Sequence, residues 1–146
     1  MVFRVLQIAI PFIWFGAVCA ISFMEAPLKF TAPNITVPLG LSIGMIVFHT
    51  LNKIEIVLCV LLALSFFAAR PRTKFPLGAF AVIALVLIIQ TVVLFPMLDE
   101  RARQVINGTA PPFSSLHIVY IATDSIKVLL LFILGFVLAR GSIKFE

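Results

Sequence analysis

Long runs of apolar residues dominate the chain, and short polar segments separate them. Four such runs are visible, at about residues 5–24, 38–69, 75–98 and 113–139. Each has the length of about 20 residues that a helix needs to cross the hydrocarbon core of a bilayer. A membrane β-barrel would instead require alternating segments of about 10 residues, and the sequence has no such segments. The pattern predicts an all-α integral membrane protein, a four-helix bundle that forms a single transmembrane domain over residues 1–146.

Composition agrees with a protein that uses lipid as its solvent. Hydrophobic residues make up 62% of the chain and charged residues 12%, whereas soluble domains are about 45–50% apolar and about 25% charged. The formal net charge is +5, but the sequence has no basic patch interleaved with exposed aromatic residues. Lysines and arginines at helix ends explain the charge, and we expect no nucleic-acid partner.

The basic residues that flank the four runs predict their orientation. Six of them fall on one side, namely Arg4, Arg70, Arg72, Lys74, Arg140 and Lys144, and three on the other, namely Lys29, Arg101 and Arg103. Because loops rich in lysine and arginine stay in the cytoplasm, we expect both termini there. The small size and tight connections favour a multi-pass protein of the bacterial inner (cytoplasmic) membrane.

Polar and charged side chains inside the apolar runs are the candidates for function. A charge at the centre of a transmembrane helix costs about 2.5–3.5 kcal/mol on insertion scales, and such charges usually face the bundle interior in pairs. The fourth run carries a set at spacings of 3, 4 and 3, namely His117, Tyr120, Asp124 and Lys127. These spacings place all of its members on one stripe of a helix, and Asp124 can pair with Lys127 along it.

The other runs and their ends add further polar residues. They are His49, Asn52, Lys53 and Glu55 in the second run, Gln90 in the third, Glu25 after the first and Arg101 after the third. In the predicted orientation nearly all these groups lie in the outer half of the bundle or near its midplane, and the cytoplasmic half is almost purely apolar. The sequence therefore predicts a polar chamber that opens outward.

Two functions fit this chamber. In the first, it binds or conducts a small ligand, an ion or a proton. Its floor would be formed by Asn52, Glu55, Asp124 and Lys127, and its mouth by His49, His117, Tyr120, Glu25 and Arg101, with Gln90 facing it from the third helix. In the second, the charges only fix helix packing, as in a non-catalytic accessory or assembly subunit of a membrane complex, or in a homo-oligomer.

A haem site is a third hypothesis. His49 and His117 are the two histidines of the chain and lie on different helices, so their imidazoles could be the axial ligands of a b-type haem. Zinc or copper would need more ligands than these and the distant thiols of Cys19 and Cys59, and no metal site is predicted. Ser125 has no histidine at a matching depth to activate it, so we expect no enzyme activity.

Several short motifs resemble a known group of proteins. They are Ala26-Pro27 with Phe30, then Gly40, Ile43-Gly44 and Phe48, then Pro96 with Arg101, and finally His117. With these residues the chain resembles bacterial four-helix integral membrane proteins defined by a domain of unknown function, to which a eukaryotic family of small transmembrane proteins is similar. The resemblance implies an integral four-helix membrane protein with no established reaction.

Overall fold

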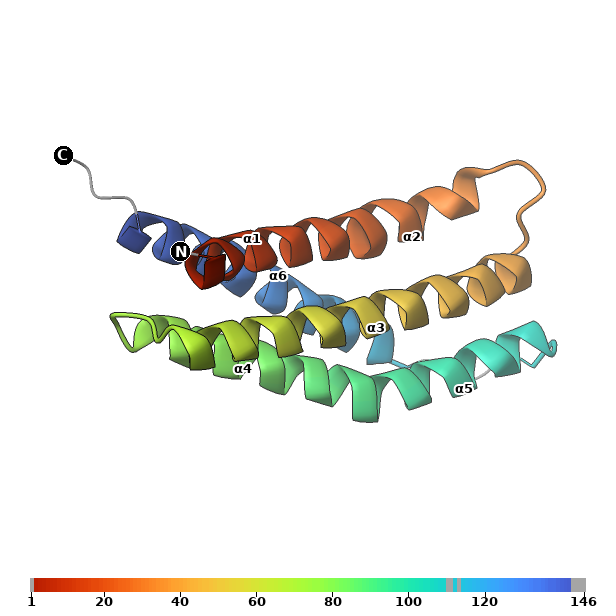
Figure 1. Ribbon diagram of the computed structural model, residues 1–146. Helices are drawn as coiled ribbons and strands as arrows, with labels where there is room; N and C mark the ends of the chain where they lie inside the picture. The colour runs from red at the N-terminus through yellow and green to blue at the C-terminus, as the bar shows by residue number, and fades with distance from the viewer. Residues whose placement is uncertain (1, 110–111, 113, 143–146) are drawn as a thin grey trace.

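A computed structural model of the protein describes residues 2–109, 112 and 114–142, and these form four long helical rods with no β-strand among them. Neighbouring rods run antiparallel, so that the start of the first, the end of the fourth and the connection between the second and third lie at one end of the molecule (Figure 1). Each rod is long and apolar enough to cross a membrane. The predicted all-α fold of four membrane-spanning helices is confirmed.

The first rod is a continuous helix from Val2 to Thr31. It consists of α1 (Val2–Val18), the π-helical segment η1 (Cys19–Glu25), α2 (Ala26–Leu28) and the 3₁₀ turn η2 (Lys29–Thr31). The sequence predicted an end near residue 24, which is too early. Glu25 and Lys29 pair at 3.3 Å one turn apart, and such a pair supports the continuation of the helix past residue 24.

The second rod is α3 (Val37–Ala68), close to the predicted 38–69. Thr36 caps its start, because its hydroxyl oxygen accepts a hydrogen bond from the backbone N–H of Leu39 at 3.3 Å. Pro38 lies in the first turn, where its missing N–H is not needed.

The third rod consists of α4 (Phe75–Ile89), the π-helical segment η3 (Gln90–Leu94) and α5 (Phe95–Ile106). The charged segment after residue 98 continues the helix as far as Ile106. Asn107 is the C-cap residue, and Gly108 follows with a φ of 80°, a left-handed conformation that glycine adopts without strain.

The fourth rod is α6 (Leu116–Ser142). The hydroxyl oxygen of Ser114 accepts a hydrogen bond from the Leu116 N–H at 3.2 Å, at the start of the helix. The helix extends three residues past the predicted end at residue 139. The predicted start at Phe113 and the basic residue Lys144 lie outside the described residues.

The charged residues divide the molecule into two unlike ends. We call one the basic end; it carries Arg4, Arg70, Arg72, Lys74 and Arg140. We call the other the mixed-charge end; it carries Glu25, Lys29, Asp99, Glu100, Arg101 and Arg103. Between them, α1, α3, α4 and α6 enclose a core of fully buried side chains that includes Trp14, Leu62, Ile83, Leu131 and Leu134.

The half of the bundle next to the basic end is less purely apolar than predicted. Gln7 is buried there, and its side-chain amide donates to the backbone carbonyls of Ser65 at 2.8 Å and Ala69 at 2.6 Å. This amide gives the Ala69 carbonyl a donor just past the end of α3, and it is a second donor to the Ser65 carbonyl, which also accepts the Ala69 N–H.

Candidate functional site

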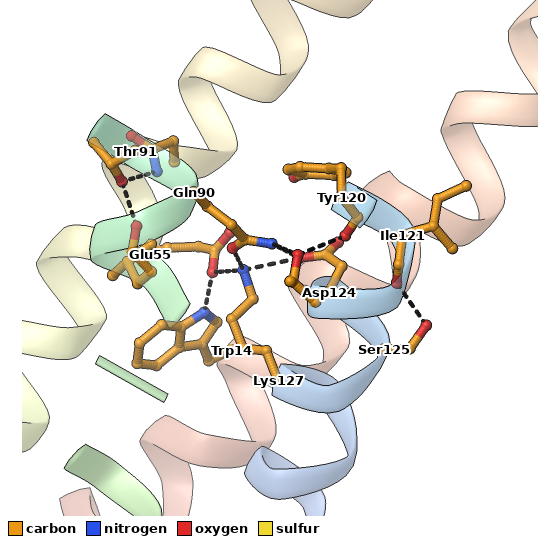
Figure 2. A network of polar contacts seen from close by, with 12 residues as sticks. Trp14, Glu55, Gln90, Thr91, Tyr120, Ile121, Asp124, Ser125 and Lys127 are labelled. Atoms are coloured by element: carbon orange, nitrogen blue, oxygen red, sulfur yellow. Dashed lines mark hydrogen bonds and ion pairs between the residues drawn. The ribbon is translucent and has the colours of Figure 1, made fainter. Parts of the chain in front are cut away.

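A cluster of buried polar side chains joins all four rods near the middle of the bundle. Its members, which we call the buried charge network, are Trp14, Glu55, Gln90, Asp124 and Lys127, and each is almost inaccessible to solvent (Figure 2). The Lys127 ammonium lies at the centre, 2.6 Å from Glu55 Oε2, 2.9 Å from Asp124 Oδ1 and 2.7 Å from Gln90 Oε1. An ammonium has three hydrogens to donate, so these three acceptors satisfy it fully.

The remaining members orient the two carboxylates. The indole N–H of Trp14 donates to Glu55 Oε2 at 2.7 Å, and the Gln90 amide donates to Asp124 Oδ1 at 3.1 Å. With both carboxylates ionised, the network has two negative charges and one positive charge, and this residual negative charge lies inside a membrane-spanning bundle.

The π-helical segment η3 brings polar side chains of the third rod into this region. It contributes Gln90 and, next to it, Thr91, whose hydroxyl accepts a hydrogen bond from the Asn52 amide at 2.8 Å. Asn52 thus lies one turn from Glu55 on α3 but bonds to Thr91 rather than to the network.

Asp124 contributes a buried acceptor without a partner among the described residues. Asp124 Oδ2 is buried and makes no hydrogen bond to any described residue, although Oδ1 of the same carboxylate has two. A buried acceptor that is left unpaired carries a desolvation penalty of about 1–3 kcal/mol, and more when it is charged. Asp124 Oδ2 can therefore accept a further hydrogen bond.

Asp124 also lies at the edge of a cavity. This cavity, which we call the Asp124 cavity, has a volume of about 400 Å³ and lies between the first rod, α3, α5 and the start of α6. Its wall is mainly apolar and aromatic, with Phe30, Phe48, Phe95 and Tyr120 among its lining residues. The ring of Tyr120 packs edge-on against Phe48 and Phe95, at centroid distances of 5.8 and 5.7 Å.

Lysine, aspartate and histidine side chains at or next to the mixed-charge end add to the lining. They are Lys29, Asp99 and His117. The Lys29 ammonium pairs with Glu25 and lies 5.6 Å from the ring centroids of both Phe30 and Phe48.

Glycines in the first turns of α3 leave room for the segment that covers this cavity. A Cβ atom on Gly40 would collide with the ring of Phe30, and one on Gly44 would lie 3.0 Å from the Lys29 ammonium. The Gly40-x-x-x-Gly44 pair therefore permits close packing of the η2 turn on α3.

The structure divides the predicted site residues into three groups. Glu55, Gln90, Asp124 and Lys127 meet in the buried charge network, and Asp124, Tyr120 and His117 line the cavity. The others are Asn52, His49, Glu25 and Arg101, which lie outside both sets. The predicted pairing of Asp124 with Lys127 along the helix is present.

The two histidines have different surroundings. His49 Nε2 lies 2.7 Å from Asp99 Oδ2, and its ring stacks on Phe95 with a centroid distance of 5.5 Å. His117 lines the Asp124 cavity, whereas His49 is not among its lining residues. A haem held by both histidines stays a prediction. Within the described residues, no group of three or more His, Cys, Asp or Glu is placed to hold a metal ion.

Several residues of this region were not among the predicted site residues. They are Trp14 in the network, Thr91 beside it, and Lys29, Asp99 and the phenylalanines around the cavity. Trp14 had a usable signal, because the N–H of a buried indole usually finds an acceptor and this is the one tryptophan of the chain. The phenylalanines had no such signal in the sequence, because an apolar run does not distinguish a ring that faces lipid from one that lines a cavity.

Comparisons with known proteins found no match to the chain among family models, curated proteins or solved structures. The resemblance to bacterial four-helix membrane proteins of unknown function stays a prediction.

Proposed function

We propose that this multi-pass membrane protein binds a small, largely apolar ligand that donates a hydrogen bond, or carries a positive charge, to Asp124. The apolar body of the ligand would occupy the Asp124 cavity. One observation carries the proposal: the unpaired Asp124 Oδ2 belongs to a residue that lines a cavity of about 400 Å³.

The chemistry of the cavity selects the class of ligand. An ionised carboxylate only accepts hydrogen bonds, so the ligand must supply the donor. A cation would in addition balance the residual negative charge of the network. The surrounding aromatic rings favour a ligand with an apolar or aromatic body and also attract cations through their faces, and the volume lies in the range of about 300–1,000 Å³ that is typical of small-molecule sites.

The packing beyond the network favours binding over conduction. Leu62, Ile83, Leu131 and Leu134 have no exposed surface in the part of the bundle that leads toward the basic end. A ligand in the Asp124 cavity would therefore meet closely packed side chains beyond Lys127, which suits a binding site.

A probe series tests the proposal on purified protein in detergent. We expect 4-phenylbutylamine and 4-phenylbutanol to raise the melting temperature, and the hydrocarbon butylbenzene to do so much less, because it has no donor for Asp124. The variant Asp124→Asn should lower the apparent affinity for the amine by about tenfold or more, as expected for the loss of a charge-assisted hydrogen bond of about 1.5–3 kcal/mol.

Two further variants make this test decisive. Because Asp124 also pairs with Lys127, Ala102→Phe serves as an independent variant that fills the cavity from its α5 wall without touching the network. Ser125→Ala is the matched control on α6, since Ser125 is exposed and its hydroxyl donates only to the carbonyl of Ile121. Equal stabilisation by amine and hydrocarbon, or an unchanged response in Ala102→Phe, would contradict the proposal.

The proposal extends to orientation. Because basic loops stay in the cytoplasm, we assign the basic end to the cytoplasmic side of a bacterial inner membrane and the Asp124 cavity to the outer side.

A second function, an accessory subunit of a membrane complex, is favoured by Lys53. This residue lies near the middle of α3, on its exposed side, and has no ion-pair or hydrogen-bond partner among the described residues. Lysines within membrane spans usually pair with an acidic group, so a partner helix with a carboxylate at this depth would fit.

Native electrophoresis of gently solubilised membranes tests this second function. Lys53→Leu should lower the apparent mass of the complex, and Lys53→Arg should preserve it, because arginine keeps the charge. If the mass stays the same with leucine, Lys53 holds no partner.

A further inference from the structure

The five cations at the basic end have no acidic partners within the described residues. The carboxylates that the structure describes all lie elsewhere, either in the buried charge network or at the mixed-charge end: they are Glu25, Glu55, Asp99, Glu100 and Asp124. Arg4 donates to the neutral groups of Gln7 and the Arg70 backbone, and Arg140 lies over the ring of Phe136 at 5.2 Å. Within the part of the chain that the structure describes, this end thus carries positive charge without a compensating carboxylate.

A second cavity lies among these cations. It has a volume of about 600 Å³, and we call it the Arg4 cavity. It is bounded by the start of α1, the connection between α3 and α4, and the last turns of α6. Its polar lining includes Arg4, Arg72 and Thr73, and its apolar lining includes Val5, Ile8 and Val137.

Arg4 is already held in position for an anion. Its guanidinium donates to Gln7 Oε1 at 3.3 Å and to the carbonyl oxygen of Arg70 at 2.9 Å. A guanidinium has five N–H groups, so others remain for a ligand. Because two bonds fix its plane, little side-chain entropy is lost when it binds a phosphate through paired N–H donors.

We propose that the Arg4 cavity binds an anionic phospholipid, with the phosphodiester on Arg4 and Arg72 and part of an acyl chain against Val5, Ile8 and Val137. Basic residues beside an apolar groove, at the level where membrane-spanning helices end, match a lipid that is charged at its head and apolar in its tail. Arginine and lysine side chains near an anionic lipid surface attract it electrostatically. The site is separate from the Asp124 cavity and does not depend on the ligand proposed there.

Native mass spectrometry of the full chain in detergent tests the proposal. We expect the protein to retain phosphatidylglycerol about tenfold more tightly than phosphatidylcholine with the same acyl chains. Arg4→Gln and Arg72→Gln should each reduce this preference to about threefold or less. Lys74→Gln is the matched control, because it removes the same charge at the same end from a residue that does not line the cavity.

Three further comparisons separate a lipid site from simpler explanations. If Lys74→Gln weakens phosphatidylglycerol as much as Arg72→Gln does, the attraction is diffuse and the site is refuted. If glycerol phosphate or inorganic phosphate displaces the lipid at equal concentration, the cavity binds small anions and the acyl chain plays no part. Unchanged Trp14 fluorescence in each variant confirms that the bundle is intact, and retention of phosphatidylcholine equal to that of phosphatidylglycerol overturns the proposal.

Discussion

Lys127 provides the positive charge of the buried network, and its burial explains how the bundle tolerates two carboxylates inside a membrane. Each of its ammonium hydrogens faces an acceptor within 2.9 Å. Breaking a buried ion pair by removing one partner typically costs about 3–5 kcal/mol, because the other charge is left uncompensated. The fold should therefore depend strongly on this one side chain.

The first prediction is that Lys127→Met destabilises the protein by about 3–5 kcal/mol. The methionine has a similar length, so the loss reflects the two carboxylates that then face each other without a cation. Unfolding of the purified protein by increasing mole fractions of denaturing detergent measures the change.

Lys53→Met is the control for this prediction. Lys53 is on the exposed side of α3 and has no ion-pair partner among the described residues, so its replacement should leave the stability of the isolated chain within about 1 kcal/mol. A similar loss from both variants would show that the network does not hold the rods together.

At the scale of the elements, the contact between the η2 turn and α3 closes one wall of the Asp124 cavity. Gly40 allows it, because any Cβ atom at this position would overlap the ring of Phe30. Unlike the end of a long flexible chain, an aromatic ring that lines a cavity moves only as a whole. The glycine is therefore needed for packing, and its φ angle is an ordinary helical one.

The second prediction is that Gly40→Ala destabilises the protein by about 1–3 kcal/mol through overpacking and lowers probe affinity at the Asp124 cavity. Gly78→Ala in α4 is the matched control, since no atom lies within 4 Å of the added Cβ there. Because alanine is the better helix former by about 0.5–1 kcal/mol, the control should be neutral or slightly stabilising in the same thermal assay. If both variants behave alike, Phe30 does not pack as described.

The helices themselves could be predicted from the sequence, but their local geometry could not. Each π-helical segment ends shortly before a proline, Pro27 after η1 and Pro96 after η3. Proline lacks the N–H that an α-helix needs and its ring crowds the preceding turn, which favours a wider turn. A proline does not always produce a π-helical segment, because Pro11 lies inside the regular α-helix α1.

For the candidate site, too, the sequence predicted which polar residues lie within the helices but not all of the contacts between helices. The spacing of Asp124 and Lys127 on one helix shows in the sequence alone, and so does the presence of Glu55 and Gln90 in other apolar runs. That Asn52 bonds to Thr91 instead of joining them depends on the rotation of α3 against η3. Such rotations follow from side-chain packing across rods, which a single sequence does not show.

At the scale of the whole molecule, the two ends differ in both charge and architecture. The basic end has the Arg4 cavity and cations without acidic partners among the described residues, and the mixed-charge end has the Asp124 cavity and ion pairs such as Lys29 with Glu25. A membrane distinguishes such ends, since positively charged segments are retained on its cytoplasmic side. The orientation would decide from which side the proposed ligand reaches Asp124.

The third prediction is that the basic end faces the cytoplasm. In a variant without Cys19 and Cys59, single cysteines are placed at Thr73, in the connection between α3 and α4, and at Thr109, after α5. A membrane-impermeant maleimide applied to intact cells should label the cysteine at position 109 and should label that at position 73 only after the cells are opened. The reverse pattern would place the Asp124 cavity on the cytoplasmic side, and its ligand would then have to come from the cell interior or the inner leaflet.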